Sequence, residues 1–199
     1  MNELEKRYLD VTGLETRADE SKKIIEGYAL KFNTWSNDLG GFIETIKPEA
    51  LKDTDMSDVR ALIDHDSSKV IGRTTAGTLQ LKVDDVGLHF RCELPNTSYA
   101  NDLYENIKAG NINQCSFGFI IDDNGDELRQ DPKTGMYQRT IKKIKSLFDV
   151  SVVTYPAYEA SSVAVATRNL NQVKQEFEKR KELLLLQLKL DKDFLQVTE

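Results

Sequence analysis

The sequence predicts a mainly β fold with helices (α+β), in which a small, closed or nearly closed β-barrel is followed by a helical tail. Segments rich in β-branched and aromatic residues recur at close spacing from Lys23 onward, as in small barrels. A single amphipathic helix interrupts them, and after about Arg168 only helix formers remain. We therefore expect a flexible, polar segment over residues 1–22, a barrel domain over 23–167 and a helical tail over 168–199.

Strands are expected where side chains alternate with a period of two residues. The first begins at Lys23, and the others cover residues 42–47, 59–65, 78–83, 87–94, 114–121, 137–144 and 147–155. The segment 124–135 carries Asn, Gly, Asp and Pro, which favour turns, so it is predicted to be a hairpin tip.

One helix is expected inside the β-rich region. Residues 95–98 supply candidates for its N-cap. Tyr99, Leu103 and Ile107 then fall on one face, and Gly110 is placed to end the helix.

The tail carries a wide apolar face. One stripe contains Leu170, Val173, Phe177 and Leu184, and an adjoining stripe contains Leu183, Leu186, Leu190 and Phe194. Such a face needs a partner, which could be the barrel, a second copy of the helix or another protein.

Composition excludes several classes of function. The chain is 39% hydrophobic and 30% charged, with a net charge of −6, and it has no basic run that would indicate nucleic-acid binding. The longest apolar run, residues 183–186, is far shorter than the roughly 20 residues that span a membrane. The N-terminus lacks the apolar core of a secretion signal. Cys92 and Cys115 are expected to be buried free thiols in a reducing cytoplasm.

His65 is the first candidate for chemistry. It lies at the end of an apolar strand in ALIDHDSSKVIGR. If that strand continues through residue 66, Asp64 and Asp66 share one face and His65 takes the other. An acidic partner for the ring would then come from elsewhere in the chain. The alternative is a solvated turn.

Ser116, in NINQCSFGFII, is expected to face the same way as Gln114 and Gly118, while apolar neighbours anchor the strand on the other face. Gly118 leaves room for a substrate chain. A serine hydroxyl becomes a nucleophile only beside a base such as histidine. The alternative is an ordinary strand serine.

Asp149, in KSLFDVSVVTYPAY, is expected on the same face as Ser151 and opposite an apolar face that includes Phe148. A carboxylate inside such a strand needs a partner. It could orient a base, as the third member of a triad does, or pair with Arg139 or Lys143.

No metal or cofactor is expected. Two histidines, His65 and His89, without close Cys or His spacing give no zinc pattern. The chain contains neither a phosphate-binding glycine loop nor a G-x-S-x-G motif.

The order and wording of several segments resemble the prohead protease family of tailed bacteriophages. The matching pieces, which span roughly residues 24–166, are Gly27-Tyr28-Ala29, Phe42-Ile43-Glu44, ALIDHDSSKVIGRT, LKVDDVGLHFRCELPNT, IKAGNINQCSFGF and LFDVSVVTYPAY.

The resemblance implies a Greek-key-like barrel similar to the herpesvirus assembly protease. It also implies a serine endopeptidase inside the immature capsid, the prohead, in the host cytoplasm. Such proteases cut the scaffolding segment from the major capsid protein and cut themselves. The implied partners are therefore the major capsid protein with its scaffolding segment and other copies of the chain, in a possible homo-oligomer. No nucleic acid or membrane partner is implied.

By position, the resemblance makes His65 the general base, Ser116 the nucleophile and Asp149 the third member. The family pattern Leu-x-Glu-Val-Ser leads us to expect glutamate where this chain has Asp149, so the reach of the shorter side chain is in question. The herpesvirus relatives use a second histidine in this role, which keeps His89 as an alternative. Arg73 is the candidate arginine for the oxyanion, and its alternative is a surface strand arginine.

A second class of function is a catalytically silent scaffold or interaction module in the capsid interior, built on the same fold. It rests mainly on the helical tail. The retained pair of His65 and Ser116 favours the protease.

Overall fold

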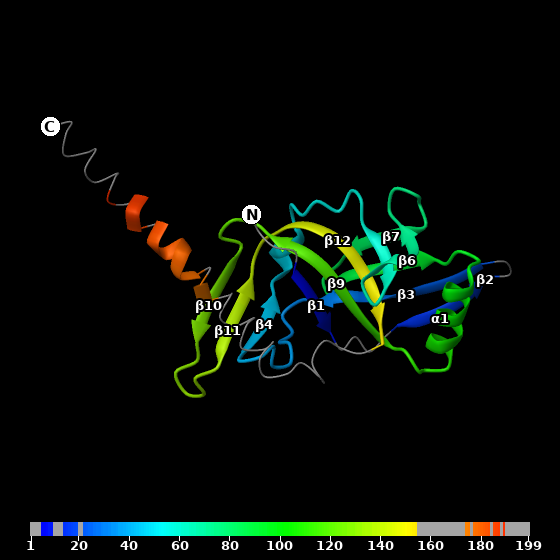
Figure 1. The fold of residues 1–199 in the computed structure, drawn as a ribbon, viewed down its shortest axis with the longest axis horizontal. Coiled ribbons are helices and arrows are strands. Elements are labelled where there is room, and N and C mark those ends of the chain that lie inside the picture. The colour runs from blue at the N-terminus through cyan, green and yellow to red at the C-terminus, as the bar shows by residue number, and fades with distance from the viewer. Residues whose placement is uncertain are drawn as a thin grey trace.

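The computed structural model describes residues 5–9, 14–19, 22–154, 174–175, 177–183, 185–187 and 189. Along the chain lie β1 (Glu5–Leu9), β2 (Glu15–Asp19), β3 (Lys22–Lys31), β4 (Phe42–Ile46), the 3-10 turn η1 (Pro48–Leu51), β5 (Arg60–Ile63), β6 (Asp66–Arg73), β7 (Leu79–Val83), β8 (Gly87–Glu93), α1 (Ser98–Lys108), β9 (Gln114–Ile121), β10 (Asp126–Gln130), β11 (Tyr137–Ile141) and β12 (Ile144–Val153) (Figure 1).

The strands form three sheets. A five-stranded sheet has the order β1-β9-β12-β5-β6, a four-stranded sheet the order β2-β3-β8-β7, and a three-stranded sheet the order β10-β11-β4. The prediction of a mainly β fold with helices is confirmed. The predicted closed or nearly closed barrel is not confirmed: the described strands form open sheets, because each of the three sheets keeps two edge strands. Alternation in a sequence identifies strands, but closure depends on whether distant edges meet.

The core lies between the five-stranded and four-stranded sheets. From β9 it takes Phe117 and Phe119, whose rings stack with centroids 5.1 Å apart. From the opposite sheet it takes Ile25, Leu30 and Phe90 among others. β9 therefore crosses the centre of the molecule, and its middle residues are held rigidly.

Helix α1 is confirmed close to its predicted position. Thr97 occupies the N-cap, and Leu103 and Ile107 are buried. Gly110, with a φ of +77°, adopts the left-handed conformation that ends the helix.

The flexible segment predicted over residues 1–22 contains two strands instead. β1 pairs with β9, and β2 pairs with β3, both antiparallel. Their sequences, EKRYL and ETRAD, are charged and show no apolar alternation. Both are edge strands, which pair through backbone hydrogen bonds with one neighbouring strand. Backbone pairing does not depend on the side chains, so these two sequences lack the apolar alternation by which a strand is predicted.

The predicted hairpin tip at residues 124–135 is shorter than expected. β10 occupies Asp126–Gln130 and pairs with β11, so that Gln130 lies opposite Tyr137. Only the residues between these two form the tip.

The described residues of the tail, from 174 to 189 with gaps, are helical. Phe177 packs on the small cluster of Leu39 and Phe42, and Arg180 Nη1 donates to Asp126 Oδ1 at 2.6 Å. The start of this tail helix thus contacts the three-stranded sheet, and the helix then leaves the domain (Figure 1). The predicted tail residues before 174 and after 189, and Leu184, lie outside the described residues.

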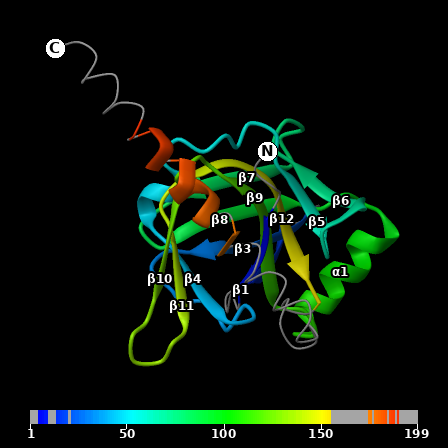
Figure 2. The same ribbon diagram turned by 60° about the vertical axis from the view of Figure 1, so that its left-hand side comes forward.

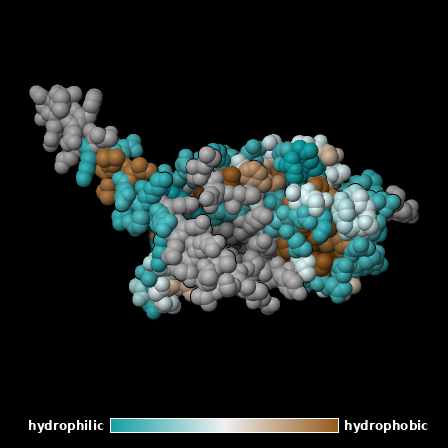
Figure 3. Space-filling model, viewed as in Figure 1, coloured by the Kyte–Doolittle hydropathy of each residue, from teal (hydrophilic) through white to brown (hydrophobic). Residues whose placement is uncertain are grey.

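Beyond these contacts the tail helix exposes apolar side chains. Leu183, Leu185 and Leu186 are each more than half exposed, and Figure 3 shows apolar side chains on the projecting helix. No helix among the described residues has both the length and the apolar character needed to cross a membrane.

Both cysteines are buried free thiols, as expected. Burial raises the pKa of the Cys92 and Cys115 thiols to about 12.

Candidate active site

A two-residue turn holds His65. The strand predicted over 59–65 ends at Ile63, and a second strand, β6, begins at Asp66, which lies opposite Ile63 in the register. Asp64 and His65 form the turn with φ values of 50° and 55°. Positive φ at both central residues is the requirement of a type I′ hairpin turn. The strand therefore ends two residues before the predicted residue 65 and does not run through residue 66. The turn is present as in the alternative, but it is not a solvated one at His65, whose side chain is buried.

Asp64 fixes this turn against the end of β12. Its carboxylate accepts hydrogen bonds from the backbone N–H of Thr154 at 2.8 Å and from the Thr154 hydroxyl at 3.1 Å. Its own N–H donates to the carbonyl of Val152. Left-handed backbone costs about 1–2 kcal/mol for most residues but is tolerated by aspartate. These bonds hold His65 in a conformation that the free chain would rarely adopt.

Ser116 lies at the middle of β9 and is fully buried. On one side its neighbour in the sheet is Ser151 of β12, and on the other side it is Tyr8 of β1. The Ser116 hydroxyl forms a hydrogen bond with His65 Nε2.

Asp149 is carried by β12, where a bulge changes the pattern. The register shifts between Leu147 and Asp149, so Phe148 is the extra residue and is 39% exposed. The predicted apolar face of β12 therefore lacks Phe148. Asp149 itself lies opposite Gly118, whose missing side chain leaves space beside the carboxylate.

Asp149 reaches His65 directly. The Nδ1 atom of His65 is 2.6 Å from Asp149 Oδ1, and the two side chains are only 2% and 8% exposed. The shorter side chain of aspartate therefore suffices at this position. An Nδ1–H donated to the carboxylate leaves the Nε2 lone pair facing the Ser116 hydroxyl. The hydrogen-bonded series runs from Ser116 through His65 to Asp149.

Ser151 is a fourth member of this network that the sequence reasoning did not single out. Its hydroxyl donates to Asp149 Oδ1 at 2.6 Å and lies 3.2 Å from His65 Nδ1. The signal was present in the sequence, because residues 149 and 151 of one strand share a face. Asp149 thus accepts two hydrogen bonds on one oxygen, which fixes its orientation.

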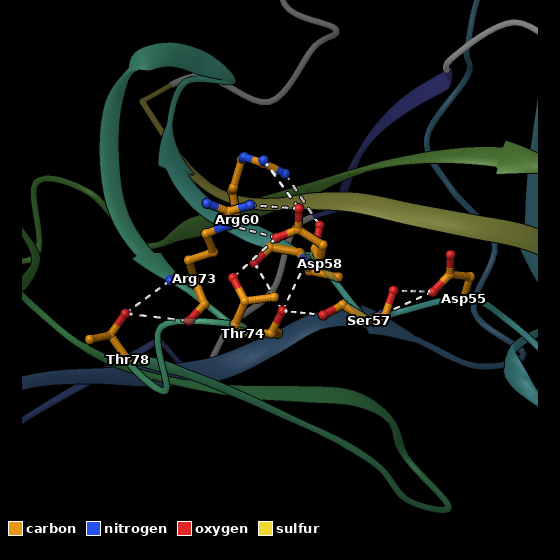
Figure 4. Close-up of polar contacts among 9 residues, drawn as sticks. Asp55, Ser57, Asp58, Arg60, Arg73, Thr74 and Thr78 are labelled. Atoms are coloured by element: carbon orange, nitrogen blue, oxygen red, sulfur yellow. Dashed lines mark hydrogen bonds and ion pairs between the residues drawn. The ribbon is translucent and has the colours of Figure 1, made fainter.

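The structure does not bring Arg73 to this network. The Arg73 guanidinium donates to Asp58 from Nε at 2.6 Å and from Nη2 at 2.7 Å, and Arg60 lies on the same carboxylate (Figure 4). Arg73 holds the pKa of Asp58 well below its usual range, at about 2. The paired guanidinium joins β6 to the loop before β5, which matches the surface-arginine alternative.

His89 is also elsewhere. It lies on β8 in the four-stranded sheet, opposite Tyr28, whose ring it meets edge-on at 5.2 Å. The place beside His65 Nδ1 that a second histidine would need is taken by Asp149. Among the described residues, no group of three or more His, Cys, Asp or Glu side chains could hold a metal ion.

Comparison with known proteins agrees with the resemblance seen in the sequence. Residues 12–176 match the family of caudovirus prohead serine proteases. The chain is 30% identical over 156 residues to the prohead protease of Enterobacteria phage HK97, covering 78% of this chain and 65% of that relative. This chain therefore matches slightly less than two thirds of the relative's length.

A solved structure is similar in fold. The capsid assembly protease of bacteriophage T4 superposes with a TM-score of 0.50, covering 76% of this chain and 97% of that one, at 14% identity. At this identity the likeness concerns the fold alone. The family match extends over most of the chain and includes all three residues of the hydrogen-bonded series. The chain belongs to the family of caudovirus prohead serine proteases.

Proposed function

We propose that this chain is a serine endopeptidase that acts during prohead maturation, with Ser116 as nucleophile, His65 as general base and Asp149 as the residue that orients the base. The observation that carries the proposal is the buried hydrogen-bonded series of these three side chains, contributed by β9, the β5–β6 turn and β12.

The proposed reaction begins when Ser116 Oγ attacks the scissile carbonyl carbon while His65 Nε2 takes the hydroxyl proton. The peptide C–N bond then breaks, and His65 gives this proton to the leaving amine. Water attacks the resulting ester with His65 again acting as base, and Ser116 is regenerated. Asp149 stabilises the imidazolium that forms in each step.

Ser151 would assist through Asp149. A carboxylate that accepts two hydrogen bonds on the same oxygen has little freedom to rotate. Ser151 donates to Asp149 Oδ1 and lies beside His65 Nδ1, away from the Nε2 atom that meets Ser116, so we assign it a positioning role.

For the substrates, we propose the scaffolding segment of the major capsid protein and the chain itself. The place of action would be the interior of the immature capsid in the host cytoplasm. These assignments follow from family membership and from the names of the relatives, a prohead protease and a capsid assembly protease. The finer likeness to the herpesvirus assembly protease stays a prediction.

The experiment is co-expression of this chain with the major capsid protein of the same phage, followed by gel analysis of both proteins. Ser116→Ala should abolish processing of the capsid protein and of the protease, because loss of a catalytic serine costs many orders of magnitude in rate. Ser68→Ala is the matched control. Ser68 lies on β6 just after the His65 turn, and both its N–H and its hydroxyl donate to Asp66 Oδ1. Normal processing by the Ser116→Ala protein would refute the proposal.

A silent scaffold module is the second candidate function, and the exposed Leu183, Leu185 and Leu186 of the tail helix favour it. The same experiment separates the two. With a silent scaffold the capsid protein would stay uncut with the wild-type chain as well as with Ser116→Ala, whereas a protease would cut it with the wild-type chain alone.

A further inference from the structure

The face of the five-stranded sheet that carries the candidate active site also carries two arginines. In this sheet β12, β5 and β6 are consecutive neighbours (Figure 2). Asp149 of β12 lies opposite Arg60 of β5, and Arg60 in turn lies opposite Arg73 of β6. Residues that lie opposite each other in a sheet share a face, so both arginines are on the same side of the sheet as Asp149.

The burial of the neighbouring residues agrees with this placement. Val150 and Ala61 are also opposite each other, and both belong to the hydrophobic core. Asp149 and Arg60, one position earlier in each strand, therefore point to the other side of the sheet. Adjacent strands lie about 4.8 Å apart, a distance that an arginine side chain can cross. Arg60 is thus within reach of the carboxylate that orients His65.

Arg60 turns instead to Asp58, two positions before it in the chain. Arg73 fixes this carboxylate by donating to its two oxygens at 2.6 and 2.7 Å. Arg60 Nη2 donates to Asp58 Oδ2 and Arg60 Nη1 to the Asp58 carbonyl, each at 3.3 Å (Figure 4). The backbone beside it is also held, since the N–H of Val59 donates to Thr74 Oγ1 at 2.9 Å. Asp58 therefore offers Arg60 a stationary partner on the side away from Asp149.

We infer that Asp58 is a positioning residue for the proteolytic reaction, which holds Arg60 away from Asp149 so that the Asp149 carboxylate stays paired with His65. This inference rests on the proposed function and adds to it a residue that protects the orienting carboxylate. Arg73 contributes by fixing Asp58.

An arginine paired with Asp149 would oppose the reaction. The negative charge of Asp149 stabilises the imidazolium that forms on His65 in each step. A guanidinium on the same carboxylate would lie about 6–7 Å from the imidazole ring and would repel its positive charge. With an effective dielectric constant of about 20, a like charge at this distance slows the reaction roughly fiftyfold to a hundredfold.

The test measures capsid-protein processing by full-length variants over a range of capsid-protein concentrations, which separates kcat from KM. Asp58→Asn should lower kcat roughly fiftyfold to a hundredfold, because the released Arg60 turns to Asp149. KM should change by less than about threefold, since the effect falls on the imidazolium and not on substrate binding. Adding Arg60→Gln removes the competing charge and should return kcat to within about threefold of the wild type. A merely structural role of Asp58 predicts no such rescue.

Two controls make the result specific. Asp122→Asn breaks another surface ion pair, with Lys143 at 2.6 Å, and should leave kcat and KM unchanged. Arg60→Gln alone should also leave both unchanged, because Arg60 acts on the reaction only when Asp58 releases it. Thermal unfolding of each variant reports whether the fold is kept. If Asp58→Asn unfolds, Asp58→Ser repeats the test, since its hydroxyl still accepts from Arg73 and carries no charge.

An unchanged kcat in Asp58→Asn would overturn the inference, as would a double variant that stays as slow as Asp58→Asn. A raised KM in Arg60→Gln alone would also overturn it, because Arg60 would then bind the substrate. Failure of the proposed function gives a different result, in which Ser116→Ala still processes the capsid protein.

Discussion

Replacing Asp149 by asparagine tests the part of the site that the structure defines best. The substitution keeps the size of the side chain and the place of its oxygen opposite His65 Nδ1, but it removes the negative charge. The carboxylate is almost wholly buried and accepts hydrogen bonds from His65 and Ser151, both at 2.6 Å. Solvent therefore cannot replace the lost charge.

The size of the effect follows from Coulomb's law. With charge centres about 4 Å apart and an effective dielectric constant of about 20, the carboxylate stabilises the imidazolium by about 4 kcal/mol. Since each 1.36 kcal/mol on a barrier is tenfold in rate, kcat should fall roughly a thousandfold. The amide can also hold His65 in the tautomer with its proton on Nε2, which raises the expected loss to about 10⁴-fold.

The assay is the rate of capsid-protein processing at pH 7.5, with circular dichroism to show that the fold is kept. Asp66→Asn is the matched control, since Asp66 also adjoins His65 but its carboxylate accepts from the N–H and hydroxyl of Ser68. The processing rate of that variant should fall by less than about tenfold. Near-full activity of Asp149→Asn, with an inactive His89→Ala, would refute the assigned orientation of His65.

Three further predictions concern smaller effects. Ser151→Ala should lower kcat by about tenfold with little change in KM, because it removes one of the two hydrogen bonds to the orienting carboxylate oxygen. Single-turnover kinetics measure this, and an unchanged kcat would contradict it. Cys92 and Cys115, whose pKa values are raised by burial, should resist iodoacetamide at pH 8 in the native protein and react once urea unfolds it; rapid native alkylation would contradict the burial. The pKa of Asp58 is depressed in the folded state, so its pairing with Arg73 should stabilise the protein above about pH 4 and cease to do so as the pH falls towards about 2. The urea midpoints of the wild type and Asp58→Asn should converge over that range, and a constant difference would contradict the pairing.

Much of the site's arrangement was predictable from strand periodicity. The alternation around β9 predicted that apolar neighbours of Ser116 would anchor the strand, and Phe117 and Phe119 do so. His65 Nδ1 meets Asp149, a partner from elsewhere in the chain as expected, although Asp64 and His65 do not lie on strand faces. Asp64 and Asp66 bond to Thr154 and Ser68, because of a turn and not because of strand faces.

What the sequence did not reveal was local irregularity. Positive φ at Asp64 and His65 leaves no clear mark when neither residue is glycine or asparagine. The bulge at Phe148 adds one residue to β12, which a strict two-residue period cannot show. Arg73 was assigned from its position after a glycine, whereas its contacts depend on Asp58, which lies fifteen positions away in the sequence. Charged pairs between loops and strands carry no periodic signal.

The most direct test of the central claim is the site at which the active protein reacts with a fluorophosphonate, measured by mass spectrometry after proteolysis. The reagent should be used under conditions in which the wild-type protein processes the capsid protein, so that the site is accessible. We predict a single adduct, on Ser116, that disappears in Ser116→Ala and forms far more slowly in His65→Ala, because the imidazole activates the hydroxyl. An adduct on another residue, or labelling at the same rate without His65, would contradict the account.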